Sequence, residues 1–213
     1  MIFEQISAGG DRNFSYLVAD EILRVGFVVD PSFDCDRVLD SIKAHRITVK
    51  YIVNTHSHAD HMAGNAIIKK ETSARVVMHS FSRAKHDLSV EDGSALEVGS
   101  LRARVIHTPG HTSDSICLLV GEKLITGDTL FVGKVGGTDY GEGARQEYNS
   151  LHGKLMSLPD GTEVWPGHDY GTRAHSTLGE ERQSNPFILR KTFREFVELK
   201  RNWLEYKRLH GIK

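Results

Sequence analysis

The stretch YIVNTHSHADH, residues 51–61, places four candidate metal ligands within six residues, directly after a short apolar run. These ligands are His56, His58, Asp60 and His61. Protonated imidazoles crowded at the end of a strand would repel one another, and polar groups buried without partners would each cost roughly 2–7 kcal/mol. A divalent cation removes both costs, because neutral imidazoles and carboxylates are ligands of zinc, iron and manganese. The stretch therefore predicts a metal site at the exit of a strand.

The composition indicates one large domain, alone or with a short appendage. The chain has 213 residues, 39% of them hydrophobic, and its 27 Lys and Arg residues nearly balance 28 Asp and Glu residues. This balance favours neither nucleic acid nor an anionic membrane as a partner. No segment approaches the roughly 20 apolar residues of a membrane span, and the N-terminal residues do not resemble a signal peptide. Cys35 and Cys117 do not suggest a disulfide framework, so we expect a reducing, cytoplasmic location.

Strand-like and helix-like segments alternate in both halves of the chain. Apolar runs bounded by turn residues predict strands at 2–6, 14–18, 22–29, 50–53, 74–78, 101–106, 115–120, 123–126 and 163–165. Apolar residues at three-to-four spacing predict helices at 36–45, 63–70, 143–158 and 190–209. The alternation is typical of an α/β protein in which helices cover two sheets. The aromatic face of the last helix is expected to pack on its own domain, with a homo-oligomer contact as the alternative.

Three more polar residues follow apolar runs in the same way, each beside glycine or proline: His111, Asp128 and His168. Strand ends at one sheet edge can converge, and glycine allows the backbone to approach closely there. Alone, Asp128 could cap a turn and His168 could be an ordinary loop histidine. Together the seven residues fit two ions that lie about 3.5–4 Å apart and share a carboxylate. His107 is expected to end a strand or to support the site, without binding metal.

The ordered set His56-x-His58-x-Asp60-His61, His111, Asp128 and His168 resembles the metal ligands of the metallo-β-lactamase superfamily. The resemblance extends over most of residues 1–190. It implies an αβ/βα four-layer sandwich with two mixed sheets, a catalytic domain over 1–189 and a helical extension over 190–213. It also implies two metal ions, zinc or else iron or manganese. In that pattern the first ion is held by His56, His58 and His111, the second by Asp60, His61 and His168, and Asp128 bridges them.

Two branches of that superfamily resemble this chain. The segment GDTLF at 127–131 and the modest length resemble glyoxalase II, the hydroxyacylglutathione hydrolase. The segments at 138–140, 168–170 and 176–186 resemble the persulfide dioxygenases, which oxidise glutathione persulfide with oxygen. Those enzymes use one iron, at positions that match His56, His111 and Asp128. Both branches keep all seven ligand-type residues, so the number of ions stays open.

Gly136-Gly137 departs from both branches, which carry Arg or Lys just before the Thr-Asp-Phe-like segment to help bind glutathione. Full glyoxalase II also has a long helical C-terminal domain, whereas only about 25 residues follow Asn185-Pro186 here. Lys134, Arg145, Arg173 or the Arg190-Lys191 pair could substitute. Glutathione as the substrate therefore stays open.

The resemblance to glyoxalase II implies a thioester hydrolase that uses a metal-bound hydroxide, with Asp60 and Asp128 as catalytic residues. Tyr140 and Tyr170 are candidates for binding the substrate, or else partly buried core tyrosines. The alternative is a dioxygenase with a single Fe(II). A catalytically silent protein would have lost ligands, and a nuclease would show a basic stripe. We expect a small thioester or thiol-derived substrate, and neither nucleic acid nor membrane as partner.

Overall fold

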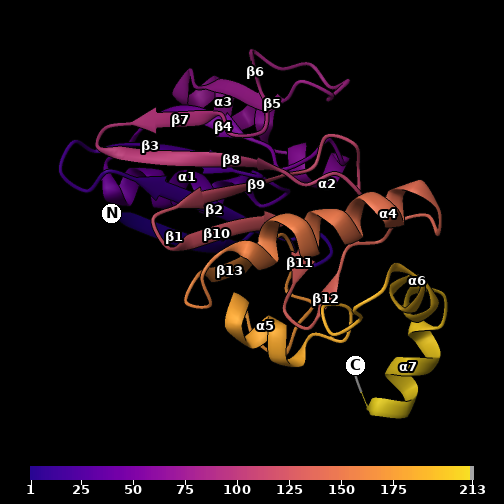
Figure 1. Ribbon diagram of the computed structural model, residues 1–213. Coiled ribbons are helices and arrows are strands. Elements are labelled where there is room, and N and C mark those ends of the chain that lie inside the picture. Colours follow the sequence, from indigo (N-terminus) through magenta and orange to yellow (C-terminus); the bar gives the residue numbers. More distant parts are fainter. Residues whose placement is uncertain (212–213) are drawn as a thin grey trace.

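Two six-stranded mixed sheets stack against each other, and helices cover the outer face of each (Figure 1). The computed structural model describes residues 1–211. The first sheet has, in spatial order, β1 (Ile2–Ser7), β2 (Phe14–Ala19), β3 (Val25–Val29), β4 (Thr48–Val53), β5 (Arg75–His79) and β6 (Leu88–Val90). The second has β14 (Ser176–Thr177), β13 (Glu163–Pro166), β10 (Lys123–Gly127), β9 (Ile116–Val120), β8 (Leu101–His107) and β7 (Ala95–Val98). The predicted α/β arrangement of two mixed sheets is confirmed.

Helices form the two outer layers of the sandwich. The first sheet is covered by α1 (Cys35–His45) and α3 (Asn65–Thr72), which follows the single turn α2 (Ala59–Met62). The second sheet is covered by α4 (Glu142–Asn149), α5 (Leu178–Ser184) and α6 (Phe193–Arg201), with α7 (Trp203–His210) after it. A short hairpin, β11 (Leu130–Phe131) and β12 (Lys134–Val135), lies beside the second sheet. No helix within residues 1–211 has the length and apolar character that crossing a bilayer requires.

Strand β2 shows how the sequence specifies the layers. All six of its residues are buried, because each face of the strand meets a different apolar cluster. Tyr16 and Val18 pack between the two sheets, whereas Leu17 and Ala19 pack beneath α1 and α3. Successive side chains of a strand point to opposite faces, so a continuous apolar run suits a sheet that is covered on both sides.

Strand direction brings the loops with polar residues to one edge. In the second sheet, β8 and β10 both pair antiparallel with β9, and β13 pairs parallel with β10. The carboxyl ends of β8, β10 and β13 therefore share an edge. The backbone N–H of Ile116 donates to Thr55 O at 2.8 Å, and the N–H of Phe14 donates to Gly167 O at 2.8 Å. The first bond connects this edge to the residues that follow β4, and the second connects it to the start of β2 in the first sheet.

Several predicted elements differ in the structure. The strand predicted at 22–29 begins at Val25, because Asp20 accepts hydrogen bonds from two backbone N–H groups and holds the preceding residues in a turn. The helix predicted at 63–70 begins at Asn65, after α2. The helix predicted at 143–158 continues from α4 as a π-helical turn, Ser150–Lys154, and a 3₁₀ turn, Leu155–Ser157. The sequence does not predict the short elements α2, β6, β7, β11, β12, β14 and α5.

The helix predicted at 190–209 is interrupted at Asn202, which separates α6 from α7. Phe196, Val197 and Leu199 of α6 pack into the apolar cluster under the second sheet, and Trp203 packs against it. The aromatic face of this segment thus packs on its own chain, as expected. The boundary between a domain at 1–189 and an extension at 190–213 stays a prediction, and residues 212–213 lie outside the described part.

Candidate metal centre

All seven predicted ligands lie together at the shared edge of the two sheets. Three sets have their ligand atoms within 4.8 Å of one another: His56, His58 and His111; His56, His61 and Asp128; and Asp60, His61 and His168. They come from the loop after β4, the turn α2, and the loops after β8, β10 and β13. The convergence of four strand ends, which the sequence predicts, is confirmed.

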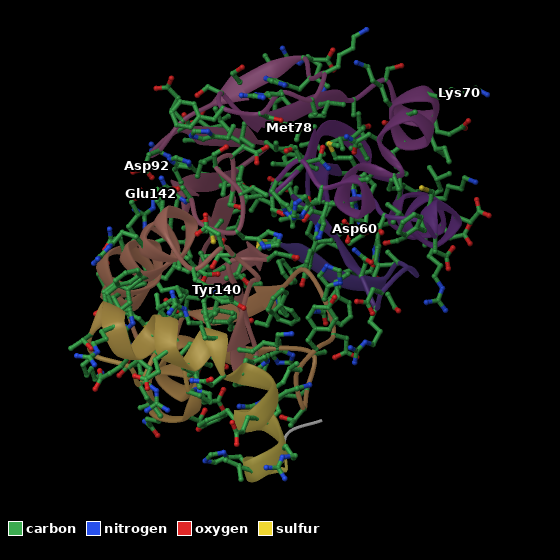
Figure 2. All side chains as sticks on the ribbon, turned by 90° about the vertical axis from the view of Figure 1, so that its right-hand side faces the viewer. Asp60, Lys70, Met78, Asp92, Tyr140 and Glu142 are labelled. Carbon is green, nitrogen blue, oxygen red and sulfur yellow. The ribbon has the colours of Figure 1, made fainter. Side chains whose placement is uncertain are left out.

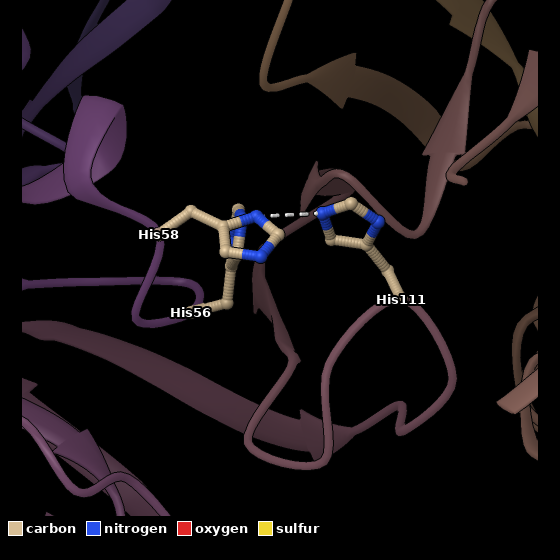
Figure 3. Close-up of side chains that lie close together, drawn as sticks. All are labelled: His56, His58 and His111. Carbon is tan, nitrogen blue, oxygen red and sulfur yellow. Dashed lines mark hydrogen bonds between the residues drawn. The ribbon is translucent and has the colours of Figure 1, made fainter. Parts of the chain in front are cut away.

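Three imidazoles form the first group, which Figure 3 shows in close-up. His58 Nδ1 lies 3.0 Å from His56 Nε2 and 3.0 Å from His111 Nε2. His56 is buried, whereas His58 is exposed. The three rings therefore meet at a point that is closed on one side and reachable from solvent on the other.

A second group holds two imidazoles and a carboxylate. His61 Nε2 lies 3.2 Å from His168 Nε2, and each of these atoms lies 3.5 Å from Asp60 Oδ2. The same carboxylate oxygen accepts a hydrogen bond from Asn13 Nδ2 at 2.9 Å, which fixes its orientation. Figure 2 shows Asp60 among the N-terminal elements, at the edge that faces the C-terminal half.

Asp128 lies between the two groups. Its Oδ1 is 3.3 Å from His61 Nε2, and its Oδ2 is 3.5 Å from His111 Nε2 and 3.4 Å from His168 Nε2. Burial raises the pKa of this carboxyl group, but the neighbouring imidazoles of His168 and His61 outweigh burial and hold the pKa well below its usual value. Oδ1 is buried and accepts no hydrogen bond from residues 1–211. A buried, ionised oxygen without a partner is what a bound cation would satisfy.

Hydrogen bonds behind the rings determine which nitrogens face the centre. His111 Nδ1 lies 2.7 Å from Gly137 O, and His168 Nδ1 lies 2.9 Å from Asp11 O. Carbonyl oxygens only accept, so both Nδ1 atoms carry a proton and donate it. In a neutral imidazole the other nitrogen then has a free lone pair. The Nε2 atoms of both rings therefore present lone pairs to the centre.

Asp30 orders two further rings. It accepts from Thr55 Oγ1 at 2.6 Å and contacts His61 Nδ1 at 2.9 Å. Because the Thr55 hydroxyl gives its proton to Asp30, it accepts from His56 Nδ1, 3.1 Å away. In the neutral rings, the Nε2 atoms of His56 and His61 are then also unprotonated. Lone pairs that face one another at such distances repel, and a cation between them removes the repulsion, so the residues present fit a metal ion.

The pKa values of the histidines follow from burial and neighbouring charge. Burial lowers the pKa of His56 well below its usual value and also lowers that of His111, so both rings are neutral, as metal ligands must be. Burial also acts to lower the pKa of His61, but Asp30 and Asp128 on either side outweigh it and raise the pKa well above the usual value. A cation would therefore compete with a proton at His61, and binding would release that proton.

Sequence reasoning missed the residues that support the ligands, chiefly Asp30, Thr55 and Asn13. Asp30 follows the apolar strand β3 and precedes proline, which is the same pattern that indicates the candidate ligands. At Asp30 the sequence predicts only the end of the strand at 22–29. Asn13 and the carbonyl of Asp11 lie in the loop before β2, and no sequence signal distinguishes them.

Neither predicted substrate-binding tyrosine contacts a ligand through its hydroxyl. The ring of Tyr170 stacks on His168, with centroids 4.6 Å apart, and its hydroxyl donates to Asp11 Oδ2 at 2.6 Å. Tyr140 is 51% exposed and lies near Arg201 of α6 (Figure 2). Their role in substrate binding stays a prediction. His107 ends β8 as expected, and its ring stacks on His79 outside the ligand groups.

We expect Asp30→Asn to weaken metal binding about 10- to 100-fold, as is usual for partners that orient metal-binding histidines. In Asp30 one carboxylate oxygen accepts from the Thr55 backbone N–H, and the other accepts from the Thr55 hydroxyl and contacts His61 Nδ1. An asparagine amide has a single accepting oxygen, so it cannot make both sets of contacts. Cobalt titration against a competing chelator measures the change. Asp20→Asn is the matched control, because Asp20 is also buried and accepts several hydrogen bonds, but lies at the start of the turn before β3. Equal affinities in Asp30→Asn and the unsubstituted protein would contradict the assignment.

Comparison with known proteins identifies the family. A family model described as the metallo-beta-lactamase superfamily matches residues 8–86 and 80–168. Human mitochondrial persulfide dioxygenase ETHE1 is 32% identical over 206 residues, covering 94% of this chain and 79% of the relative. A hydroxyacylglutathione hydrolase of Anaeromyxobacter dehalogenans is 36% identical over 175 residues, covering 80% of this chain and 66% of the relative.

Solved structures agree with these matches. The crystal structure of ETHE1 from Myxococcus xanthus has a TM-score of 0.89 and 36% sequence identity, and the match covers 95% of this chain and 91% of that chain. Another relative is covered over a smaller part of its own length. The chain spans 52% of the length of the beta-lactamase hydrolase-like protein of Agrobacterium fabrum, which is 33% identical over 87% of this chain.

Proposed function

Because this chain belongs to the metallo-β-lactamase superfamily, whose metal-dependent enzymes include both candidate branches, we propose that it oxidises a low-molecular-weight persulfide with dioxygen. One observation carries the choice of branch. The match to the crystal structure of ETHE1 from Myxococcus xanthus covers 95% of this chain and 91% of that chain, at a TM-score of 0.89. The fold thus supports the dioxygenase branch over nearly the whole chain.

The proposed reaction balances with a persulfide, dioxygen and water as reactants. The sulfur–sulfur bond breaks, the outer sulfur leaves as sulfite, the carrier leaves as thiol, and two protons are released. Four electrons pass from sulfur to dioxygen. In this function His56, His111 and Asp128 would hold a ferrous ion, which supplies the binding and redox chemistry of dioxygen.

The chain's own residues prepare that site. Hydrogen bonds to Thr55 and to Gly137 O direct the lone pairs of His56 and His111 inward. Gly136 and Gly137 separate His111 from a cavity of about 170 Å³. Its walls also include Lys134, Val135, Thr138, Tyr140, Phe187, Lys200 and Trp203. We propose that this cavity receives the carrier of the persulfide, with Lys134 as the partly exposed cation in its wall.

A two-ion thioester hydrolase is the second candidate, and the geometry of Asp128 favours it. Its Oδ1 faces His61 while its Oδ2 faces His111, so one carboxylate contacts both ligand groups. Such an arrangement fits two ions that share a bridging carboxylate. Asp60, oriented by Asn13, would then complete the second group.

Metal analysis combined with two assays on one preparation separates the candidates. The dioxygenase predicts about one iron per chain, with oxygen uptake and sulfite release from a persulfide. The hydrolase predicts two ions per chain and cleavage of a glutathione thioester. Activity on the thioester without oxygen uptake would reject the main proposal. Inactivity on both substrates would reject both candidates.

Gly137→Arg is expected to lower KM for glutathione persulfide at least roughly tenfold, because a charge-assisted hydrogen bond contributes about 1.5–3 kcal/mol. A side chain fits at this position, since a Cβ placed on Gly137 meets no atom within 4 Å. Steady-state oxygen uptake measures KM. Gly137→Gln is the uncharged control, and 2-mercaptoethanol persulfide is a substrate without a carboxylate. An equal gain with the control variant or with that substrate would contradict the electrostatic explanation.

A further inference from the structure

A buried ion pair connects α6 to α4, and its lysine also bonds the loop beside the candidate metal ligands. Lys200 of α6 and Glu147 of α4 have side chains only 5% and 1% exposed, and Lys200 Nζ lies 2.5 Å from Glu147 Oε2. The same ammonium donates to Gly136 O at 2.6 Å. Removing two charges from water is costly, and a buried ion pair is weak evidence of added stability. The contact that matters for its role is therefore the hydrogen bond by which Lys200 holds the Gly136 carbonyl.

The loop held by Lys200 also orients a metal ligand. Gly136 O accepts from Lys200, and the next carbonyl, Gly137 O, accepts from His111 Nδ1 at 2.7 Å. Two consecutive glycines have more backbone freedom than any other pair of residues, so their carbonyl directions need external contacts. The peptide between them is planar, and fixing the first carbonyl fixes that plane. Only the dihedral angles of Gly137 then remain to set the acceptor of His111.

Other contacts hold the two ends of this loop. Asn185 Nδ2 donates to Lys134 O at 3.3 Å, before the glycines. After them, Asp139 Oδ1 accepts from the backbone N–H groups of Gly141 and Gly143, at 2.9 Å each, where α4 begins. Within residues 1–211, Lys200 bonds the centre of the loop together with His111 itself, which donates to the next carbonyl.

We propose that the Lys200–Glu147 pair is a positioning device for His111. It holds Gly136-Gly137 so that Gly137 O keeps the proton of His111 on Nδ1 and leaves Nε2 free to bind metal. Neither residue touches the seven ligands, so both act through the loop. The helix α6, which lies in the segment expected to be an appendage, thus takes part in metal binding. This inference rests on the metal site that the proposed function requires.

Cobalt binding to the full-length double variant Lys200→Met/Glu147→Gln tests the proposal. The variant removes both charges and keeps side chains of similar size. We expect cobalt affinity to fall about tenfold, as for other groups that orient a metal ligand. We also expect a changed visible spectrum of bound cobalt and, in the metal-free protein, a His111 ¹⁵N spectrum that shows mixed tautomers. These readouts report the ligand itself, which a merely structural role would leave unchanged.

The matched control is Lys123→Met/Glu163→Gln, which removes another Lys–Glu pair, at the opposite end of β10 and β13. It is expected to bind cobalt as the unsubstituted protein does. Equal cobalt affinity, spectrum and tautomer in the Lys200 variant and the unsubstituted protein would overturn the positioning role. Absence of cobalt binding in the unsubstituted protein would instead overturn the proposed metal function.

A second variant covers the case in which the double variant does not fold. Burial raises the pKa of Glu147, whereas Lys200 acts to lower it. In Lys200→Met the lowering by Lys200 is lost, so Glu147 takes up a proton and no charge is left unpaired in the core. The same fall in affinity is expected there, and unchanged affinity would again overturn the proposal.

Discussion

Asp128→Ala is expected to lower kcat/KM at least roughly a thousandfold, since loss of several kcal/mol of electrostatic stabilisation costs about tenfold per 1.4 kcal/mol. The two oxygens of Asp128 contact His61 on one side and His111 and His168 on the other. Without the carboxylate, the site loses the negative charge that stabilises a cation among the imidazole nitrogens. The expected result holds for the dioxygenase and for the hydrolase. Elemental analysis and turnover with a persulfide and a thioester measure the effect.

Two further variants separate charge from shape in this prediction. Asp128→Asn keeps the size of the side chain and is expected to lose turnover nearly as completely as Asp128→Ala. Asp36→Ala removes an aspartate from the exposed face of α1 and is expected to leave metal content and turnover unchanged. An Asp128→Ala protein with full metal content and full turnover would place the chemistry elsewhere in the molecule.

The meeting of the seven candidate ligands could be predicted because each is a polar side chain that follows an apolar strand. β8, β10 and β13 run in the same direction, so polar residues at their carboxyl ends meet at one edge. The rule does not separate ligands from their supports. Asp30 satisfies it equally well, yet its oxygens accept from Thr55 and contact His61 Nδ1, on the side of the ring away from the centre.

Backbone acceptors could not be predicted at all. His168 Nδ1 donates to Asp11 O, 157 residues away in the chain, and His111 Nδ1 donates to Gly137 O, 26 residues away. Every residue carries a carbonyl, so nothing in the sequence distinguishes these two. Their directions depend on how two distant loops pack, and they decide which imidazole nitrogen is free.

The fold was predictable where apolar runs are long, and less so elsewhere. The strands β2 and β9 have five or six residues that pack on two layers, and their composition shows it. The strands β11 and β12 have two residues each, too few for any periodicity. The apolar spacing of the last predicted helix continues across Asn202, although the backbone changes direction there. Apolar spacing reports which side chains are buried, without reporting where a helix ends.

Gly136→Ala is expected to lower kcat/KM about a hundredfold, although it adds only a methyl group. A Cβ at this position would overlap Asp128 O and lie 3.2 Å from His111 Cβ. The obstacle is backbone, so it cannot rotate away, and overpacking of this kind costs about 1–3 kcal/mol. The required shift moves two candidate metal ligands, Asp128 and His111, and a displacement of about 1 Å can cost a hundredfold in rate. Thermal unfolding, cobalt affinity and turnover measure the three consequences.

Gly137→Ala is the matched control for this steric explanation. Gly137 is exposed, and a Cβ there meets no atom within 4 Å, so stability is expected to change by less than about 0.5 kcal/mol. Both substitutions remove the flexibility of one glycine, but only one inserts an atom against Asp128. Equal losses in the two variants would assign the effect to flexibility and contradict the steric account. Unequal losses would also explain why a basic side chain can be introduced at 137, whereas position 136 requires glycine.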